Sequence, residues 1–466
     1  MMWNLTEFRN KIAAVSKTDI ITYGDLVDQG SILLSHLPKR CLVFNLCSNV
    51  TGSFFGYITF LNHHIVQLML ADDLDKDHLK NLISTYHPAY LWAPKNIQAE
   101  LPYEKVAELY EYVLLKTDLD TYPLHEDLAL LLTTSGSTGS PKLVRQTYQN
   151  IRSNAESIAE YLEITDAERP ITTLPMNYTY GLSVINSHLL KGATILLTNK
   201  GLMQKEFWDF FKEQQATSIA GVPYTYEMLK RLRFFRMELP SLKTLTQAGG
   251  KLSPELHREF AEYAIEKGKR FVVMYGQTEA TARMSYLPWQ KTLEKCGSMG
   301  IAIPGGRFDL IDEDGNIITS PEVTGELVYT GQNVTPGYAE CGDDLIKGDE
   351  RHGVLVTGDL AKRDADGYFY IVGRKRRFLK IFGNRINLDE TERLIKAAFP
   401  DTECACIGKD DKMTICITSQ EKHTEIRNYL SQKTGLNHVA FQVKTVQQIP
   451  KNDAGKTLYA KLEEEL

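Results

Sequence analysis

The chain has 466 residues, 43% of them hydrophobic, which is enough for a large core and for more than one domain. Its 53 lysines and arginines nearly balance 59 aspartates and glutamates, so we expect no nucleic-acid partner and no polybasic membrane-binding face. The charged, amphipathic N-terminus lacks the apolar core of a signal peptide, and no apolar run is long enough to span a membrane, so we expect a cytoplasmic protein.

Strand patterns and helix patterns alternate along the first two thirds of the chain. Short apolar runs predict buried strands at residues 41–46, 64–70, 89–94, 128–134, 193–198, 217–223 and 270–276. Helical spacing predicts helices at residues 50–64, 75–87, 147–162 and 204–215. This alternation is typical of parallel sheets covered by helices on both faces.

From about residue 297 the pattern changes to short alternating strands, with Asp-Gly turns at 314 and 366. These features predict a small antiparallel lobe. The basic stretch RKRRFLKIFGNRI (374–386) is typical of a domain boundary, and a compact α+β unit follows it. We therefore expect an α/β protein with a large domain at 1–376, which includes the lobe, and a small α+β domain at 377–466.

The segment TSGSTGSPK (134–142) follows the predicted strand at 128–134 and precedes the predicted helix at 147–162. Glycines allow backbone N–H groups to converge on an anion, and the hydroxyls and Lys142 add donors and a positive charge. Strand, loop and helix in this order are typical of phosphate binding. The spacing is not that of a Walker A loop. Composition alone leaves a Ser/Thr/Gly-rich surface loop as an equal alternative.

Five segments in order carry a resemblance to a known family: TSGSTGSPK (134–142), YGQTEA (275–280), TGDL (357–360), GRKRRFLKIFGNRI (373–386) and PKNDAGK (450–456). They resemble the core motifs of the adenylate-forming superfamily, which includes acyl-CoA synthetases, luciferases and nonribosomal-peptide adenylation domains. The resemblance implies that ATP and Mg²⁺ activate a small carboxylic acid as its adenylate. The acyl group then passes to a thiol, either CoA or the phosphopantetheine of an acyl carrier protein.

The resemblance also implies roles for individual residues. Thr278, Glu279 and Lys456 are expected to be catalytic, with Thr278 on the α-phosphate, Glu279 on Mg²⁺, and Lys456 bridging the carboxylate and the α-phosphate. The expected nucleotide-binding residues are Thr134, Ser135, Gly136, Ser137, Thr138, Gly139, Lys142, Gly250, Tyr275, Gly276, Asp359 and Arg374. Without the resemblance, Tyr275 reads as core packing, Asp359 as a turn residue, and Glu279 and Lys456 as solvated charges.

The expected acid pocket contains Tyr178, Val222, Ala248 and Gly249, at strand ends that converge at the carboxyl edge of a parallel sheet. Few charged residues fall in these segments, which favours an apolar or aromatic acid. Two positions depart from the family pattern. Tyr178 stands where many relatives carry a histidine, and Arg376 stands where the hinge between the domains usually has an aspartate.

Other functions share parts of this pattern. An amide ligase that transfers the acyl group to an amine would use every residue named above. A luciferase-like oxygenase would share the first half-reaction, and a non-catalytic descendant would be expected to lose Lys456, Glu279 or the phosphate loop. The acid, the acceptor, the oligomeric state and the effect of Arg376 are left open by the sequence.

Overall fold

The computed structural model describes residues 2–133, 142–375, 377–381, 384–409, 412–434, 436–452 and 455–465. The chain divides into two compact units. The N-terminal unit comprises Met1–Arg307 and Tyr329–Leu355, and the C-terminal unit comprises Phe308–Val328 and Val356–Leu466. The assignment of nucleotide and acid binding to residues 1–376, and of the catalytic lysine to a separate mobile domain, stays a prediction.

The first sheet of the N-terminal unit has a parallel centre, as predicted. Within the described residues its order is β16 (Ile301–Ala302), β15 (Ser285–Tyr286), β14 (Arg270–Tyr275), β13 (Thr244–Gln247), β12 (Ser218–Gly221), β10 (Pro170–Ile171), β11 (Ile195–Leu196), β1 (Ile12–Val15) and β2 (Ile20–Thr22). Strands β10 to β14 pair in parallel, whereas β15 and β2 pair antiparallel with their neighbours. The segments that follow β12, β13 and β14 therefore leave the sheet at one edge.

The second sheet of this unit is mixed. Its order among the described residues is β19 (Gly337–Ala339), β9 (Leu143–Thr147), β8 (Leu128–Thr133), β4 (Val66–Ala71), β3 (Leu42–Cys47), β5 (Tyr90–Pro94), β7 (Tyr112–Lys116) and β6 (Glu104–Leu109). Strands β5, β3, β4 and β8 pair in parallel. Strands β9 and β19 extend the sheet antiparallel beyond β8.

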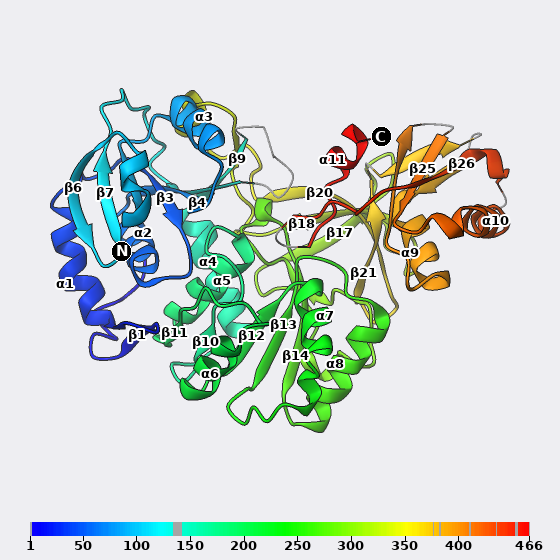
Figure 1. Ribbon diagram of the computed structural model, residues 1–466, viewed down its shortest axis with the longest axis horizontal. Coiled ribbons are helices and arrows are strands. Elements are labelled where there is room, and N and C mark those ends of the chain that lie inside the picture. The colour runs from blue at the N-terminus through cyan, green and yellow to red at the C-terminus, as the bar shows by residue number, and fades with distance from the viewer. Residues whose placement is uncertain are drawn as a thin grey trace. The chain divides into compact units, whose positions relative to one another are not determined.

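Helices α4 (Tyr148–Tyr161) and α5 (Thr179–Leu189) lie between the two sheets (Figure 1). One buried cluster runs from β3 through α4 and α5 to β11, with Val43, Ile151, Leu182 and Ile195 among its members. The other helices of the unit are α1 (Tyr23–Leu34), α2 (Thr51–Asn62), α3 (Lys76–Tyr86), α6 (Lys205–Glu213), α7 (Pro223–Arg231) and α8 (Pro254–Glu266). In the part of the chain that the structure describes, no helix is long and apolar enough to cross a membrane.

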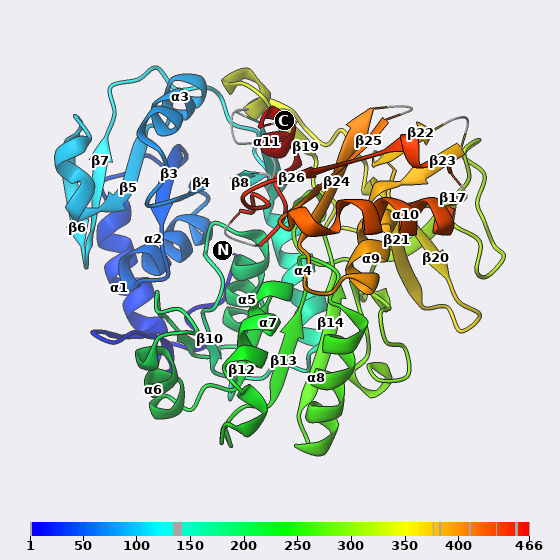
Figure 2. The same cartoon turned by 45° about the vertical axis from the view of Figure 1, so that its right-hand side comes forward.

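The C-terminal unit contains most of the predicted small lobe, a sheet of order β17 (Arg307–Ile311), β18 (Gly325–Thr330), β20 (Val354–Arg363) and β21 (Phe369–Arg374). Gly315 and Gly367 take positive φ in the predicted Asp-Gly turns. The rest contains the hairpin β22 (Phe378–Ile381) and β23 (Asn384–Asn387), the sheet β24 (Cys404–Lys409), β25 (Lys412–Ile417) and β26 (Phe441–Thr445), and helices α9 (Leu388–Ala398), α10 (His423–Thr434) and α11 (Tyr459–Glu464) (Figure 2). The mixed α/β fold class is thus confirmed.

Candidate active site

The predicted phosphate loop is flanked by paired strands. Thr134, Ser135, Gly136, Ser137, Thr138 and Gly139 lie outside the described residues. Thr133 at the end of β8 pairs with Leu143 at the start of β9. The expected strand–loop–helix order was therefore wrong, because β9 separates the loop from α4. Thr147 caps α4 by accepting a hydrogen bond from the N–H of Asn150 at 3.1 Å, so the helix N-terminus does not follow the loop directly.

Lys142, the last residue of the predicted loop, lies against the ring of Tyr338. Its Nζ is 3.9 Å from the ring centroid, and it also pairs with Glu340 at 3.4 Å. The guanidinium carbon of Arg351 is 4.6 Å from the same centroid, and the Tyr338 hydroxyl donates to Oε1 of Glu279 at 2.7 Å. Two positive charges, on Lys142 and Arg351, and the carboxylate of Glu279 thus contact the single aromatic side chain of Tyr338.

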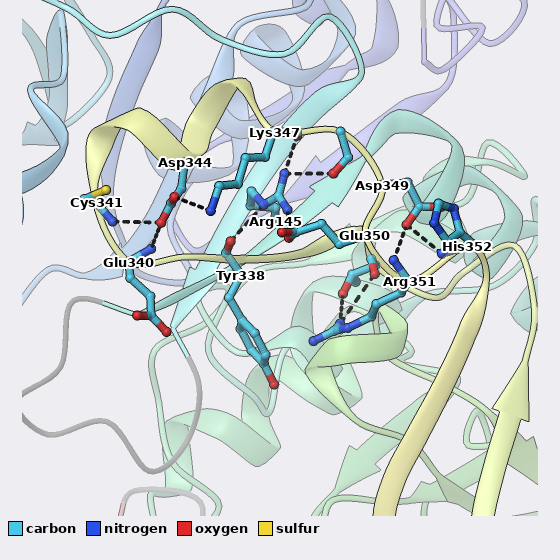
Figure 3. Close-up of polar contacts among 12 residues, drawn as sticks. Arg145, Tyr338, Glu340, Cys341, Asp344, Lys347, Asp349, Glu350, Arg351 and His352 are labelled. Carbon is cyan, nitrogen blue, oxygen red and sulfur yellow. Dashed lines mark hydrogen bonds and ion pairs between the residues drawn. The ribbon is translucent and has the colours of Figure 1, made fainter.

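Strand pairing brings Tyr338 to the loop. Tyr338 on β19 lies opposite Val144 on β9. The next residue on β9, Arg145, has a buried side chain that forms hydrogen bonds with Tyr338 and with the segment after β19 (Figure 3). Arg145 donates from Nε to the Tyr338 carbonyl at 3.0 Å and from Nη1 to the carbonyls of Lys347 and Gly348. Its Nη2 pairs with the Glu350 carboxylate. Arg145 therefore holds Tyr338 in place through backbone contacts.

The hydroxyl of Tyr338 stays protonated near neutral pH. Burial and, after it, the neighbouring Glu279 carboxylate raise the pKa of Tyr338 to about 12, although Arg351 acts in the opposite direction. The neutral phenol therefore donates a hydrogen bond to the Glu279 carboxylate and adds no negative charge of its own.

Glu279 lies in a short 3₁₀ helix, Thr278–Ala280, whose backbone is tied to the segment before β19. The Glu279 carbonyl accepts from both the N–H and the hydroxyl of Thr335 at 2.9 Å. Arg351 in turn donates to the Thr335 hydroxyl at 2.6 Å. The hydroxyl of Thr278 makes no hydrogen bond with the residues that the structure describes. The Glu279 backbone is therefore tied, through Thr335, to Arg351.

Thr281, immediately after this helix, holds a strained backbone with φ 66° and ψ −62°, which is rare for a β-branched residue. Its hydroxyl donates to the Asn333 carbonyl at 2.7 Å, and its own carbonyl accepts from the hydroxyl of Thr179. Gly276, two residues before Thr278, admits no side chain, because a Cβ there would lie 1.7 Å from the Ala282 carbonyl oxygen. Strain and close packing thus fix the chain around Thr278 and Glu279.

The predicted acid-pocket residues come together. Val222 and Ala248 are buried in one apolar cluster with Tyr178 packed against them. The next residue, Gly249, takes φ +82°, and Gly250 packs on Pro223. Burial raises the pKa of Tyr178 to about 12. Tyr275 ends β14 and accepts a hydrogen bond from the Gln277 amide at 3.0 Å.

We expect Gly249→Ala to lower the catalytic efficiency of the adenylation that the resemblance predicts about tenfold or more, because alanine is strained at positive φ and its Cβ would clash with its neighbours. The added Cβ would lie 2.7 Å from the Tyr178 hydroxyl and 3.0 Å from Val222. Acid-dependent pyrophosphate exchange and thermal unfolding measure the effect. Gly268→Ala is the matched control, since Gly268 also has positive φ but nothing within 4 Å of its Cβ position. Addition of Tyr178→Phe should recover part of the loss, and no recovery would contradict the assigned clash.

The remaining predicted residues lie in the C-terminal unit. Asp359 on β20 is buried and lies opposite Arg374 on β21, with Oδ1 of Asp359 and Nε of Arg374 3.3 Å apart. Arg376 lies outside the described residues. Lys456 closes a tight loop, in which its N–H donates to the Asn452 side chain and its carbonyl accepts from the Asn452 N–H, both at 2.9 Å.

Sequence reasoning did not single out Tyr338, Arg351, Arg145 or the buried Arg283. Tyr338 lies in the segment GQNVTPGYAE (331–340), where nothing local distinguishes it from the other aromatic residues of the chain. Arginines in otherwise polar stretches read as surface charges. The signal that identifies them is their burial and their long-range contacts, which need the tertiary structure.

Comparison with protein families gives one match over more than half of the chain, to the model described as AMP-binding enzyme, at residues 58–339. A feruloyl-CoA synthase of an Amycolatopsis species is 30% identical over 292 residues, which cover 61% of this chain and 57% of that protein. The peroxisomal OPC-8:0-CoA ligase 1 of Arabidopsis thaliana is 29% identical over 352 residues, which cover 72% of this chain and 63% of that protein. The chain thus spans less than two thirds of these relatives' lengths.

Comparison with solved structures finds the same fold. The o-succinylbenzoate CoA synthetase of Bacillus subtilis, solved with its acyl-adenylate intermediate, superposes with a TM-score of 0.79 at 21% identity. The superposition covers 98% of this chain and 97% of that one. The same synthetase has been solved with ATP and a magnesium ion, and superposes with a TM-score of 0.78.

Proposed function

The chain belongs to the AMP-binding enzyme family, and on this premise we propose that it is an AMP-forming acid–thiol ligase. In the first step a carboxylate oxygen of a small acid attacks the α-phosphorus of ATP. The new oxygen–phosphorus bond forms as the bond between the α-phosphorus and the β-phosphate oxygen breaks, and pyrophosphate leaves. In the second step a thiol sulfur bonds to the acyl carbon, the acyl–oxygen bond breaks, AMP leaves, and the thiol proton passes to solvent.

The observation that carries this proposal is the cluster of Lys142, Tyr338, Glu279 and Arg351 beside the predicted phosphate loop. A carboxylate and a triphosphate repel each other, so the site must provide positive charge where charge develops. Lys142, with Nζ 3.9 Å from the Tyr338 ring centroid, would bind the β- and γ-phosphates together with the loop residues Thr134 to Gly139. Tyr275 would stack on the adenine, with Gly250 and Gly276 leaving room for the nucleotide.

The residues present fit a magnesium ion. Mg²⁺ commonly binds through one or two carboxylates and the phosphate oxygens of a substrate, and Glu279 supplies such a carboxylate. Only Oε1 of Glu279 accepts a hydrogen bond from the described residues, from Tyr338. A Mg²⁺ ion held there would neutralise phosphate charge, while Thr278 would donate its hydroxyl to the α-phosphate.

The C-terminal unit would supply the remaining groups. The carboxylate of Asp359 would accept hydrogen bonds from the ribose hydroxyls, and Arg374, which already lies beside it, would reach the ribose or a phosphate. Lys456 would bridge the reacting carboxylate and the α-phosphate. Arg376 would lie at the hinge about which the C-terminal domain rotates between the half-reactions.

CoA is the favoured acceptor, because the relatives named above are a CoA synthase and a CoA ligase. The phosphopantetheine of a carrier protein and an amine are the alternatives. The acid would bind between Tyr178, Val222, Ala248 and Gly249, which meet in one apolar cluster or directly beside it.

A screen of carboxylic acids tests the proposal. We expect pyrophosphate release that requires ATP, Mg²⁺ and a matching acid, followed by AMP and thioester formation when CoA is added. Parallel reactions with a phosphopantetheinylated carrier protein and with an amine identify the acceptor. Formation of ADP and phosphate, or ATP hydrolysis that does not depend on any acid, would contradict the proposed reaction.

A further inference from the structure

Arg283 is a buried positive charge with no counter-ion among the described residues. Its exposed fraction is 2%. The guanidinium carbon lies 3.9 Å from the ring centroid of Tyr180, and Nη1 donates to the sulfur of Met274, a weak acceptor, at 3.6 Å. Its Nε is buried without a hydrogen-bond partner. Burial of an arginine in this way is unfavourable unless another group compensates it.

The backbone of Arg283 is held firmly. Its carbonyl accepts hydrogen bonds from the side-chain amides of Asn154 and Asn333, each at 2.9 Å. Its N–H donates to the Asn154 side-chain oxygen at 3.3 Å. Both asparagines are themselves buried. The backbone that carries the guanidinium is therefore fixed, and the Nε–H, which has no hydrogen-bond partner, is a donor that a ligand could use.

Arg283 lines a cavity between α4, α5, β12 and β13. The other lining residues include Val184, Ser187, His188, Ala220 and Thr246. Burial lowers the pKa of His188 to about 4, so this side chain is neutral and does not compete for an anion. Glu168 is the acidic residue among the cavity's described lining residues, and it pairs with Lys243 at 3.3 Å.

This cavity belongs to the acid pocket. Tyr180, Met274 and Ala220, which contact Arg283 or line the cavity with it, share one buried cluster with Val222 and Ala248. The free volume is about 20 Å³, room for about one water molecule, so binding of an acid requires neighbouring side chains to move apart. Arg283 thus places a fixed positive charge inside a pocket for which the sequence predicted apolar walls.

We propose that Arg283 determines specificity by binding a second anionic group, a distal carboxylate, on the acid that the enzyme activates. This inference rests on the proposed function. A planar guanidinium pairs with a carboxylate through two parallel N–H···O bonds. That second carboxylate would supply the missing counter-charge, while the first carboxylate reacts with ATP.

The test compares dicarboxylic acids with monocarboxylic partners of similar length. The pairs are glutarate with pentanoate, adipate with hexanoate, and terephthalate with 4-methylbenzoate. For at least one pair, we expect the wild-type kcat/KM for acid-dependent pyrophosphate release to be about 10- to 100-fold higher with the diacid. Arg283→Met should reverse this preference by lowering activity with the diacid and raising it with the monoacid. Arg283→Lys should retain part of the preference.

Arg169→Met is the control, because Arg169 is a half-buried arginine whose guanidinium already has partners, donating to Gln214 at 2.7 Å and 3.1 Å. It should leave the preference unchanged. Wild-type activity confined to monoacids would overturn the inference without any variant, and would leave the proposed function standing. Equal loss with both acids of a pair in Arg283→Met would also overturn it. ATP consumption that does not depend on any acid, in the wild type and in every variant, would instead contradict the proposed function itself.

Discussion

Replacing Lys456 by alanine is expected to lower acid-dependent pyrophosphate exchange by about 10²- to 10³-fold, the usual effect of removing one group that stabilises transition-state charge. Thioester formation from a supplied acyl-adenylate should change far less, because the α-phosphate bond has already been made. The backbone N–H and carbonyl of Lys456 bond to Asn452, and alanine retains both bonds. Thermal unfolding of the variant checks that the fold is retained.

Lys451 provides the control for this experiment. It lies in the same loop, but its Nζ pairs with Glu403 on the surface at 2.7 Å, so Lys451→Ala removes a similar charge without a proposed catalytic role. We expect both half-reactions of Lys451→Ala to resemble the wild type. If Lys456→Ala reduced both half-reactions equally, the lysine would not act specifically in adenylation.

Glu279→Gln is expected to raise the Mg²⁺ concentration for half-maximal adenylation by about 10- to 100-fold, as is typical for weakened metal sites. Glutamine keeps the shape of the side chain and still accepts the hydrogen bond that Tyr338 donates to Oε1 at 2.7 Å. The substitution therefore removes mainly the charge. Pyrophosphate exchange at a series of Mg²⁺ concentrations, with ATP held constant, measures the shift.

Two further variants separate charge from packing. Tyr338→Phe removes the hydrogen bond to Glu279 but leaves the ring beside Lys142 and Arg351, so the Mg²⁺ requirement should shift less than in Glu279→Gln. Glu294→Gln removes an exposed carboxylate that pairs with Lys291 at 2.7 Å and should leave the Mg²⁺ requirement unchanged. Wild-type Mg²⁺ dependence in Glu279→Gln would show that this carboxylate is not the metal contact.

Apolar periodicity located several of the parallel strands, because buried strands and amphipathic helices are encoded by neighbouring residues, but it missed β1, β10 and β13. The strand predicted at 270–276 corresponds to β14 (Arg270–Tyr275), and that predicted at 89–94 to β5 (Tyr90–Pro94). The prediction was wrong directly after the phosphate loop. The residues of β9 (Leu143–Thr147) include Arg145 and Gln146, so they lack the apolar alternation of a strand, although both side chains are buried.

By itself, then, the sequence determined the fold class and the order of the motifs, since both depend on local patterns of residues. Only the tertiary structure decided which side chains meet. Arg145 donates a hydrogen bond to the carbonyl of Tyr338, which lies 193 residues further along the chain. Asn154 donates one to the carbonyl of Arg283, which lies 129 residues further along. Such contacts depend on the pairing of distant strands and on burial in a shared core, and no local pattern encodes them. For this reason the buried positive charge of Arg283, beside the proposed acid pocket, was recognised only in the folded chain.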